Sequence, residues 1–201
     1  MNKGIGSFLL LCGAGIIWLP SAAAEQQRSM RNLVENPGFE MVNSTTGLPE
    51  SWRTMTPRQE VTPAFEVDSS VSHSGKSSAR TTAKGSPGTL GSWVTTVGGV
   101  QAGAEARDFG MSELTVRETD FLSRRAYRVA CFFKVRDIES PAKNIWIRVN
   151  WLNGKGQEVF TEFVSQFVKE GEWYRADQVL TAPRAARSLT LELILQWTAT
   201  G

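Results

Sequence analysis

Three stretches of this chain, residues 127–136, 145–152 and 189–197, alternate apolar with polar or mixed residues at a period of two. This period places successive side chains on opposite faces of a β-strand, and no stretch shows the 3.6-residue period of an amphipathic helix. Each stretch has one apolar face and one mixed face, which is typical of half-buried strands in an antiparallel sheet. The sequence therefore predicts an all-β fold, a two-sheet antiparallel β-sandwich.

The connections between the strands are rich in turn residues: Asn153-Gly154-Lys155-Gly156 predicts a hairpin, and Gly171-Glu172 and Ala182-Pro183-Arg184 predict further breaks. A short strand is expected around residues 112–117.

The alternation also predicts which side chains face the core. The predicted core face consists of Tyr127, Val129, Cys131, Phe133, Val135, Ile145, Ile147, Val149, Trp151, Leu189, Leu191, Leu193, Leu195 and Trp197.

The first 24 residues have the pattern of a secretory signal peptide. A short basic start precedes an apolar run, and small residues before Glu25 form a cleavage site. We expect a disordered leader at 25–31 and one domain at 32–201. The protein is therefore predicted to be secreted or periplasmic, with no membrane association after signal cleavage.

Composition argues against several classes of function. The formal net charge is only +2 and no basic block occurs, so nucleic acid is not an expected partner. His73 is the only histidine, which excludes Ser-His-Asp triads and histidine-rich zinc sites within this chain. Cys131 is the only cysteine after the signal peptide, so no intrachain disulfide forms, and its place on the core face predicts a small hydrophobic residue. No acid–base set stands out, so we expect a chain that is not an enzyme.

Three motifs in the first half of the domain occur in a characteristic order. They read NLVENPGFE at 32–40, GLPESW at 47–52 and VDSSVSHSGKSSAR at 67–80. Together with the strand pattern of the second half, they resemble the galactose-binding-like jelly rolls that serve as carbohydrate-binding modules, especially the group of families four, nine and twenty-two. The resemblance implies a first strand at 32–40 and a final strand that would follow Gly201. It thus identifies the domain as a C-terminally truncated, N-terminal module of a longer secreted protein.

The resemblance also implies a structural Ca²⁺ site. Glu40 would supply a carboxylate, Ser74 and Lys76 would supply backbone carbonyls, and a further acid would come from the final strand. Hard cations prefer such oxygen ligands. The alternative is that Glu40 simply caps the neighbouring turn.

Sugar binding requires flat aromatic faces together with side chains that hydrogen-bond hydroxyl groups. The mixed faces of the predicted strands offer such a set: Phe132, Lys134, Trp146, Arg148, Asn150 and Gln196. The alternative is that Trp146 and Phe132 pack under loops or against a following domain. A slip of one residue in register would exchange the two faces.

The expected function is a non-catalytic carbohydrate-binding module that targets a secreted or periplasmic bacterial enzyme to a polysaccharide or oligosaccharide. The alternative is a structural β-sandwich module that binds no sugar. It would pack against a C-terminal catalytic domain, either a glycoside hydrolase or a carbon-nitrogen hydrolase.

Overall fold

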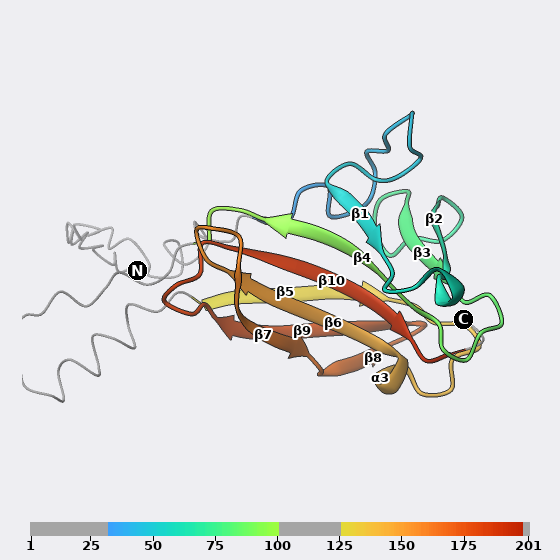
Figure 1. Ribbon diagram of the computed structural model, residues 1–201. Coiled ribbons are helices and arrows are strands. Elements are labelled where there is room, and N and C mark those ends of the chain that lie inside the picture. Colours follow the sequence, from blue (N-terminus) through green and yellow to red (C-terminus); the bar gives the residue numbers. More distant parts are fainter. Residues whose placement is uncertain (1–31, 101–125, 199–201) are drawn as a thin grey trace, which may run out of the picture. The chain divides into compact units, whose positions relative to one another are not determined.

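The computed structural model describes residues 32–100 and 126–198 (Figure 1). In these residues helix is confined to two short elements, η1 (Gln59–Val61) and α3 (Pro141–Asn144), and no helix is long and apolar enough to cross a membrane. The predicted signal peptide, leader and strand at 112–117 lie outside the described residues. The strands are β1 (Trp52–Met55), β2 (Ala64–Asp68), β3 (Ser78–Thr82), β4 (Leu90–Val97), β5 (Ala126–Phe133), β6 (Ile145–Leu152), β7 (Glu158–Val164), β8 (Phe167–Glu170), β9 (Trp173–Thr181) and β10 (Ser188–Gln196).

The strands form three antiparallel sheets. The largest has the order β1-β4-β10-β6-β7, a second has the order β5-β9-β8, and β2 pairs with β3 alone. Figure 1 shows β5 and β9 running alongside β10 and β6 in a separate layer. The predicted all-β, antiparallel β-sandwich is confirmed: the five-stranded and three-stranded sheets are its two layers, and the β2–β3 pair is an additional two-stranded sheet.

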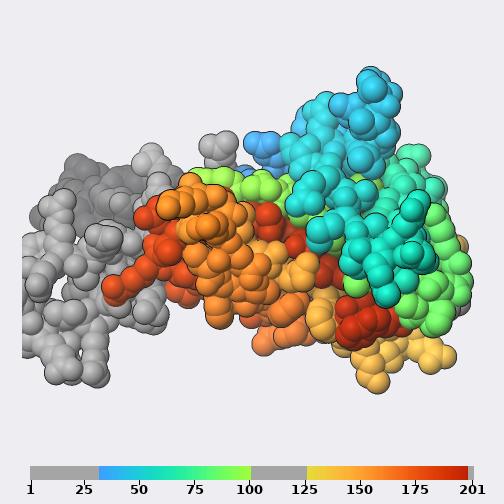
Figure 2. Space-filling view, viewed as in Figure 1, coloured from blue at the N-terminus to red at the C-terminus, as the bar shows by residue number. Residues whose placement is uncertain are grey.

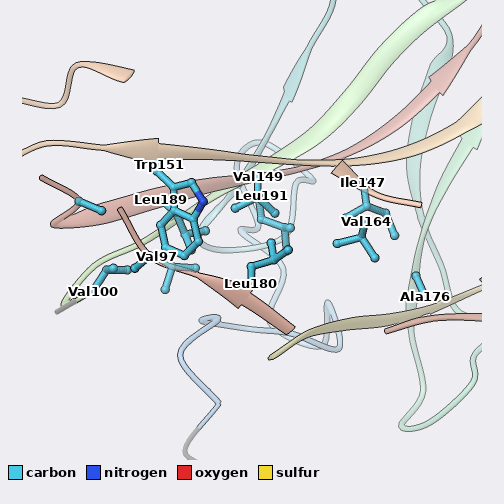
Figure 3. Packing of buried hydrophobic residues seen from close by; sticks show 12 residues of the cluster. Val97, Val100, Ile147, Val149, Trp151, Val164, Ala176, Leu180, Leu189 and Leu191 are labelled. Carbon is cyan, nitrogen blue, oxygen red and sulfur yellow. The ribbon is translucent and has the colours of Figure 1, made fainter. Parts of the chain in front are cut away.

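A hydrophobic core fills the space between the five-stranded and three-stranded sheets. Trp151 and Val149 of β6 are completely buried, and Ala176 of β9 belongs to the same cluster. Figure 3 shows side chains of β6, including Val149 and Ile147, directed toward the strand that carries Ala176. Burial of this apolar surface is the main force that holds the two sheets together.

The core faces predicted from the alternation are confirmed for the first two stretches. Tyr127, Val129, Cys131 and Phe133 of β5 pack against the core, as do Ile147, Val149 and Trp151 of β6. The predicted hairpin at 153–156 connects β6 to β7, where Gly156 has a φ of +75°.

The predicted first strand at 32–40 is wrong, because this segment is irregular. Asn36 and Phe39 have positive φ values, which interrupt an extended strand. The Asn36 amide donates to the carbonyls of Met41 and Glu50 at 2.8 and 3.0 Å, so a side chain organises the backbone here. The first strand of the described residues is β1, which begins at Trp52.

The β2–β3 hairpin packs on one end of the five-stranded sheet. The Phe65 ring meets Trp93 of β4 edge-on, with ring centroids 5.3 Å apart. A Cβ at Gly91 would lie 2.7 Å from both Phe65 and Pro63, so this close approach requires glycine.

Candidate functional site

One face of the five-stranded sheet points away from the core, and we call it the outer face. Residues that oppose each other in an antiparallel pair share a face. Even-numbered residues of β6 and β10 therefore lie together, on the side opposite to the core residue Trp151. The opposed pairs are Trp146 with Ile194, Arg148 with Glu192, and Asn150 with Thr190.

Three aromatic rings meet at one end of the outer face, and we call them the aromatic cluster. Phe163 of β7 and Trp197 each meet Trp146 nearly at right angles, with ring centroids 5.1 and 5.7 Å from that of Trp146. Phe163 is 41% exposed and Trp197 is 61% exposed. The cluster therefore offers ring faces to solvent on a surface that the sheet holds in place.

Trp197 was predicted to face the core, and the structure corrects this. Its φ of +51° breaks the alternation directly after β10 ends at Gln196. The Trp197 N–H donates to the Thr89 carbonyl at 2.7 Å, and the Asn144 amide donates to the Trp197 carbonyl at 3.1 Å. These bonds fix the turn that places Trp197 beside Trp146. In Figure 2 the red C-terminal residues lie against the yellow-orange segment around the start of β6.

A buried polar network adjoins the aromatic cluster. Glu192 is 4% exposed, and its carboxylate accepts hydrogen bonds from Arg148 at 2.6 Å and from Asn150 at 2.7 Å. The Thr161 hydroxyl donates to the Asn150 side-chain oxygen at 2.8 Å. A buried carboxylate requires such partners, and the paired groups fix one another's orientation.

Four of the six residues predicted for sugar binding lie on the outer face. Trp146, Arg148 and Asn150 form part of the aromatic cluster or the polar network. Gln196 has a structural role instead, because it is 4% exposed and its amide donates to the Lys143 carbonyl at 3.2 Å. The set predicted for sugar binding did not include Phe163 or Glu192, although Glu192 has the same parity as Gln196 along β10.

The other two predicted residues, Phe132 and Lys134, belong to the opposite sheet or its extension. Phe132 is in β5 and stacks on His73, with ring centroids 3.7 Å apart. Lys134 donates to Glu172 at 2.7 Å, and this hydrogen bond lowers the pKa of the Glu172 carboxyl. The six residues therefore do not share one face, and Phe132 is 39% exposed beside His73 of the HSGK turn.

Glu40 caps the turn that contains the HSGK motif. One carboxylate oxygen accepts hydrogen bonds from the N–H groups of Lys76 at 2.7 Å and Ser77 at 3.1 Å. The bond from Lys76 is the main reason that the pKa of Glu40 lies below its ordinary value. Gly75 has a φ of +72°, and a Cβ there would lie 2.2 Å from the same oxygen, so another residue would strain the backbone and displace the Glu40 carboxylate.

The described groups within hydrogen-bonding distance of the Glu40 carboxylate are two backbone N–H groups and the Ser77 hydroxyl, which is the arrangement that the capping alternative expects. Within residues 32–100 and 126–198, no three His, Cys, Asp or Glu side chains are grouped to hold a metal ion. A Ca²⁺ site at Glu40, Ser74 and Lys76 stays a prediction.

The single cysteine of the predicted mature chain is unsuited to nucleophilic chemistry at neutral pH. Burial raises the pKa of the Cys131 thiol to about 12, so the thiol stays protonated. Cys131 packs against the hydrophobic core, as predicted.

The fold has counterparts among solved structures. No protein-family model matches the sequence, and no curated protein matches it. The chain resembles the enzymatically active domain of tailspike protein 4 from bacteriophage CBA120 with a TM-score of 0.57 and 12% identity. That match covers 85% of this chain and 20% of the tailspike chain, so this chain spans about a fifth of its length.

Two further matches are carbohydrate-binding modules. TmCBM61, solved in complex with beta-1,4-galactotriose, gives a TM-score of 0.47 and 14% identity over 85% of this chain and 90% of its own. The CBM22-1 xylan-binding domain of Xyn10C from Paenibacillus barcinonensis gives 0.44 and 13% over 81% and 83%. At these identities the likeness concerns the fold alone.

Proposed function

We propose that this protein is a non-catalytic carbohydrate-binding module and that the outer face binds a polysaccharide or oligosaccharide. One observation carries the proposal: the aromatic cluster and the polar network lie next to each other on the same face. A sugar ring has apolar C–H faces and a rim of hydroxyl groups. The outer face presents the complementary pair of surfaces.

The aromatic cluster supplies area for stacking at low entropic cost. Tryptophan and phenylalanine have only two side-chain torsions, and the contacts of Trp146 with Phe163 and Trp197 restrict them further. Stacking on these rings would remove apolar surface from water on both partners.

The polar network retains unused hydrogen-bonding capacity. A guanidinium has five N–H donors, of which Arg148 gives one to Glu192, and the Arg148 side chain is 34% exposed. The donors for a ligand are therefore the exposed terminal N–H groups of Arg148, whereas the buried Glu192 carboxylate holds the guanidinium in place. Because these groups are held in place before a ligand arrives, hydroxyl groups would meet fixed partners.

The biological role that we propose is to target a secreted or periplasmic bacterial enzyme to its polysaccharide. The secretion pattern of residues 1–24 supports export. The catalytic activity would then belong to a C-terminal hydrolase domain of the same protein.

The test is affinity electrophoresis of the protein against a panel of neutral polysaccharides, with Trp146→Ala and a control variant. We expect the parent to be retarded by at least one polysaccharide, and Trp146→Ala to bind it about 10- to 100-fold more weakly, as for a central aromatic contact. The control is Phe160→Ala: Phe160 is 52% exposed on β7, but its register partner is the core residue Trp151, so it does not belong to the outer face. Phe160→Ala should bind like the parent.

Two results would contradict the proposal. If the parent binds nothing in a broad panel, the structural-module interpretation replaces the glycan interpretation. If Phe160→Ala and Trp146→Ala weaken binding equally, the sugar binds elsewhere.

A further inference from the structure

The side-chain amide of Asn144 joins β6 to β10 at the point where the backbone pairing of these strands ends. The last pair in their register is Ile145 with Leu195. Beyond it, the Asn144 amide donates to the carbonyls of Gln196 at 2.9 Å and Trp197 at 3.1 Å. Figure 1 places α3, whose last residue is Asn144, at the same end of the five-stranded sheet as the end of β10. The amide therefore continues the connection between the two strands past their last backbone pair.

Other hydrogen bonds hold the same turn from both sides. The Gln196 amide donates back to the Lys143 carbonyl of α3 at 3.2 Å, and the Trp197 N–H donates to the Thr89 carbonyl at 2.7 Å. Thr89 is 1% exposed, and its own N–H and hydroxyl donate to the Ser86 carbonyl at 3.0 and 2.7 Å. The acceptor for the Trp197 N–H is therefore fixed, and α3 supplies the opposite side of the clamp.

Trp197 adopts a backbone conformation that needs this support. Its φ of +51° lies in the left-handed region, which is unfavourable for a residue with a Cβ. Such residues persist where the surrounding structure determines their conformation, and they gather at ligand sites. The Trp197 side chain is 61% exposed, so burial does little to hold it. The hydrogen bonds of the turn therefore decide where its ring stands, 5.7 Å from the Trp146 ring at an angle of 75°.

We infer that Asn144 is a positioning residue for the aromatic cluster, because its amide fixes the Trp197 ring beside Trp146 before a sugar arrives. The inference rests on the proposed function of the outer face. A ring that is held in advance loses less freedom when a ligand stacks on it, so more of the contact energy appears as affinity. Asn144 thus acts on sugar binding through Trp197.

Two variants of Asn144 and one control test the inference in the full chain. Asn144→Asp keeps nearly the same shape, but a carboxylate has no N–H to donate. Asn144→Ala removes the amide without adding a charge. The control, Ala142→Asp, adds the same charge at an exposed position of α3.

The first measurement is far-ultraviolet circular dichroism, which needs no ligand. Two indole rings at the distance and angle of Trp146 and Trp197 couple electronically and give a paired positive and negative band. Trp197→Phe supplies the reference spectrum without this couplet. We expect both Asn144 variants to lose most of the couplet at temperatures well below their melting, and Ala142→Asp to keep it.

The second measurement is a double-mutant cycle on the affinity for a polysaccharide that the parent binds. Asn144→Ala should weaken binding by about 3- to 10-fold, as expected for a ring that must be ordered on binding. In a Trp197→Ala background the same change should have no further effect, since the amide acts through that ring. A purely structural role for Asn144 would weaken binding equally in both backgrounds.

The outcomes separate this inference from the proposed function. An unchanged couplet and affinity in both Asn144 variants, or an equal loss of affinity in both backgrounds, would overturn the inference alone. The same holds if Trp146→Ala abolishes binding and Trp197→Ala leaves it unchanged. If the parent binds no polysaccharide, the proposed function fails and the role of Asn144 in binding fails with it, even where the couplet shows that the amide holds Trp197.

Discussion

Alternate residues of β6 contribute to different parts of the molecule. Trp151 is completely buried in the core and donates from its indole N–H to Glu162 at 2.6 Å. Trp146, on the other side of the same strand, is half-buried in the aromatic cluster. The same residue type therefore serves packing at one position and forms a candidate contact surface at the other.

The first prediction separates these two roles. Trp151→Ala should lower the free energy of unfolding by about 3–5 kcal/mol, because it leaves a cavity between the sheets and removes the partner of Glu162. Trp146→Ala should cost roughly 1 kcal/mol, because it removes only ring contacts on a solvent-facing surface. Urea unfolding of both variants measures the difference. If the costs are reversed, the two faces of β6 have been exchanged.

The sequence predicted the face of most residues and failed where the backbone leaves the extended conformation. The alternation placed Trp146 and Arg148 on the face opposite Trp151, and the register confirms it. It could not reveal the positive φ of Trp197, which depends on hydrogen bonds with Thr89 and Asn144, residues distant in sequence. A single residue in the left-handed region moved an aromatic ring from the predicted core to the candidate site.

At the scale of elements, a strand was predictable where its two faces differ strongly from each other in polarity. β5, β6 and β10 meet this condition. β3 (Ser78–Thr82) contains no large apolar side chain, so no alternation marks it. Alternation also does not say which sheet a strand joins, because that depends on long-range pairing. For this reason Phe132 was grouped with Trp146, although β5 and β6 lie in different sheets.

The β6–β7 hairpin supplies the second prediction. Gly156 has a φ of +75°, whereas its neighbour Gly154 does not have a positive φ. Gly156→Ala should therefore cost about 1–2 kcal/mol of stability through backbone strain, even though no atom lies within 4 Å of the new Cβ. Gly154→Ala is the matched control, with only an ordinary contact to Arg187 at 3.8 Å, and should change stability by less than about 0.5 kcal/mol. Equal costs for the two variants, measured by denaturant unfolding, would argue against this turn conformation.

The turn between β2 and β3 supplies the third prediction, which concerns pH. Hydrogen bonds from Ser70 lower the pKa of Asp68, and those from the Lys76 and Ser77 N–H groups lower that of Glu40. A carboxyl with a lower pKa in the folded state stabilises the fold fully above its unfolded pKa, and this contribution is lost as the pH falls through the folded pKa. The melting temperature should therefore change little between about pH 7 and 5 and fall below about pH 4.

The variant Asp68→Asn tests this assignment. It removes the charge that accepts from Ser70 and pairs with Arg80 at 2.7 Å. We expect a lower melting temperature at neutral pH and a shallower decrease on acidification than in the parent. An acid decrease as steep as that of the parent would show that other groups cause it. Thermal melts over a pH series decide between these outcomes.

At the scale of the whole molecule, the five-stranded sheet separates two surfaces with different roles. Its core side packs against β5 and β9, and its outer face carries the aromatic cluster and the polar network. Substitutions on one side should therefore affect stability nearly independently of substitutions on the other, except through the strands themselves.

Export of the protein supplies the fourth prediction. Mass spectrometry of the protein recovered from outside the cytoplasm of its host should find Glu25, or a residue within a few positions of it, at the N-terminus. The physical reason is the short apolar run followed by small residues, which signal peptidases recognise. A mature protein that retains Met1 would contradict the assignment of residues 1–24 as a signal peptide.

The fifth prediction concerns how salt affects the proposed binding of a neutral polysaccharide. The chain has a formal net charge of only +2, and Arg148 on the outer face is already paired with Glu192. Binding by ring stacking and by hydrogen bonds to uncharged hydroxyl groups depends little on long-range charge. Raising the salt concentration from about 0.1 to 1 M shortens the screening length from roughly 10 to 3 Å, which weakens only charge-driven association. The dissociation constant should therefore change by less than about twofold, measured by isothermal titration calorimetry with a soluble oligosaccharide.

An acidic polysaccharide serves as the control, because any adsorption of it through Arg148 or surface lysines should weaken strongly over the same range. A tenfold loss with the neutral ligand would mean that charge, and not the aromatic cluster, holds the sugar.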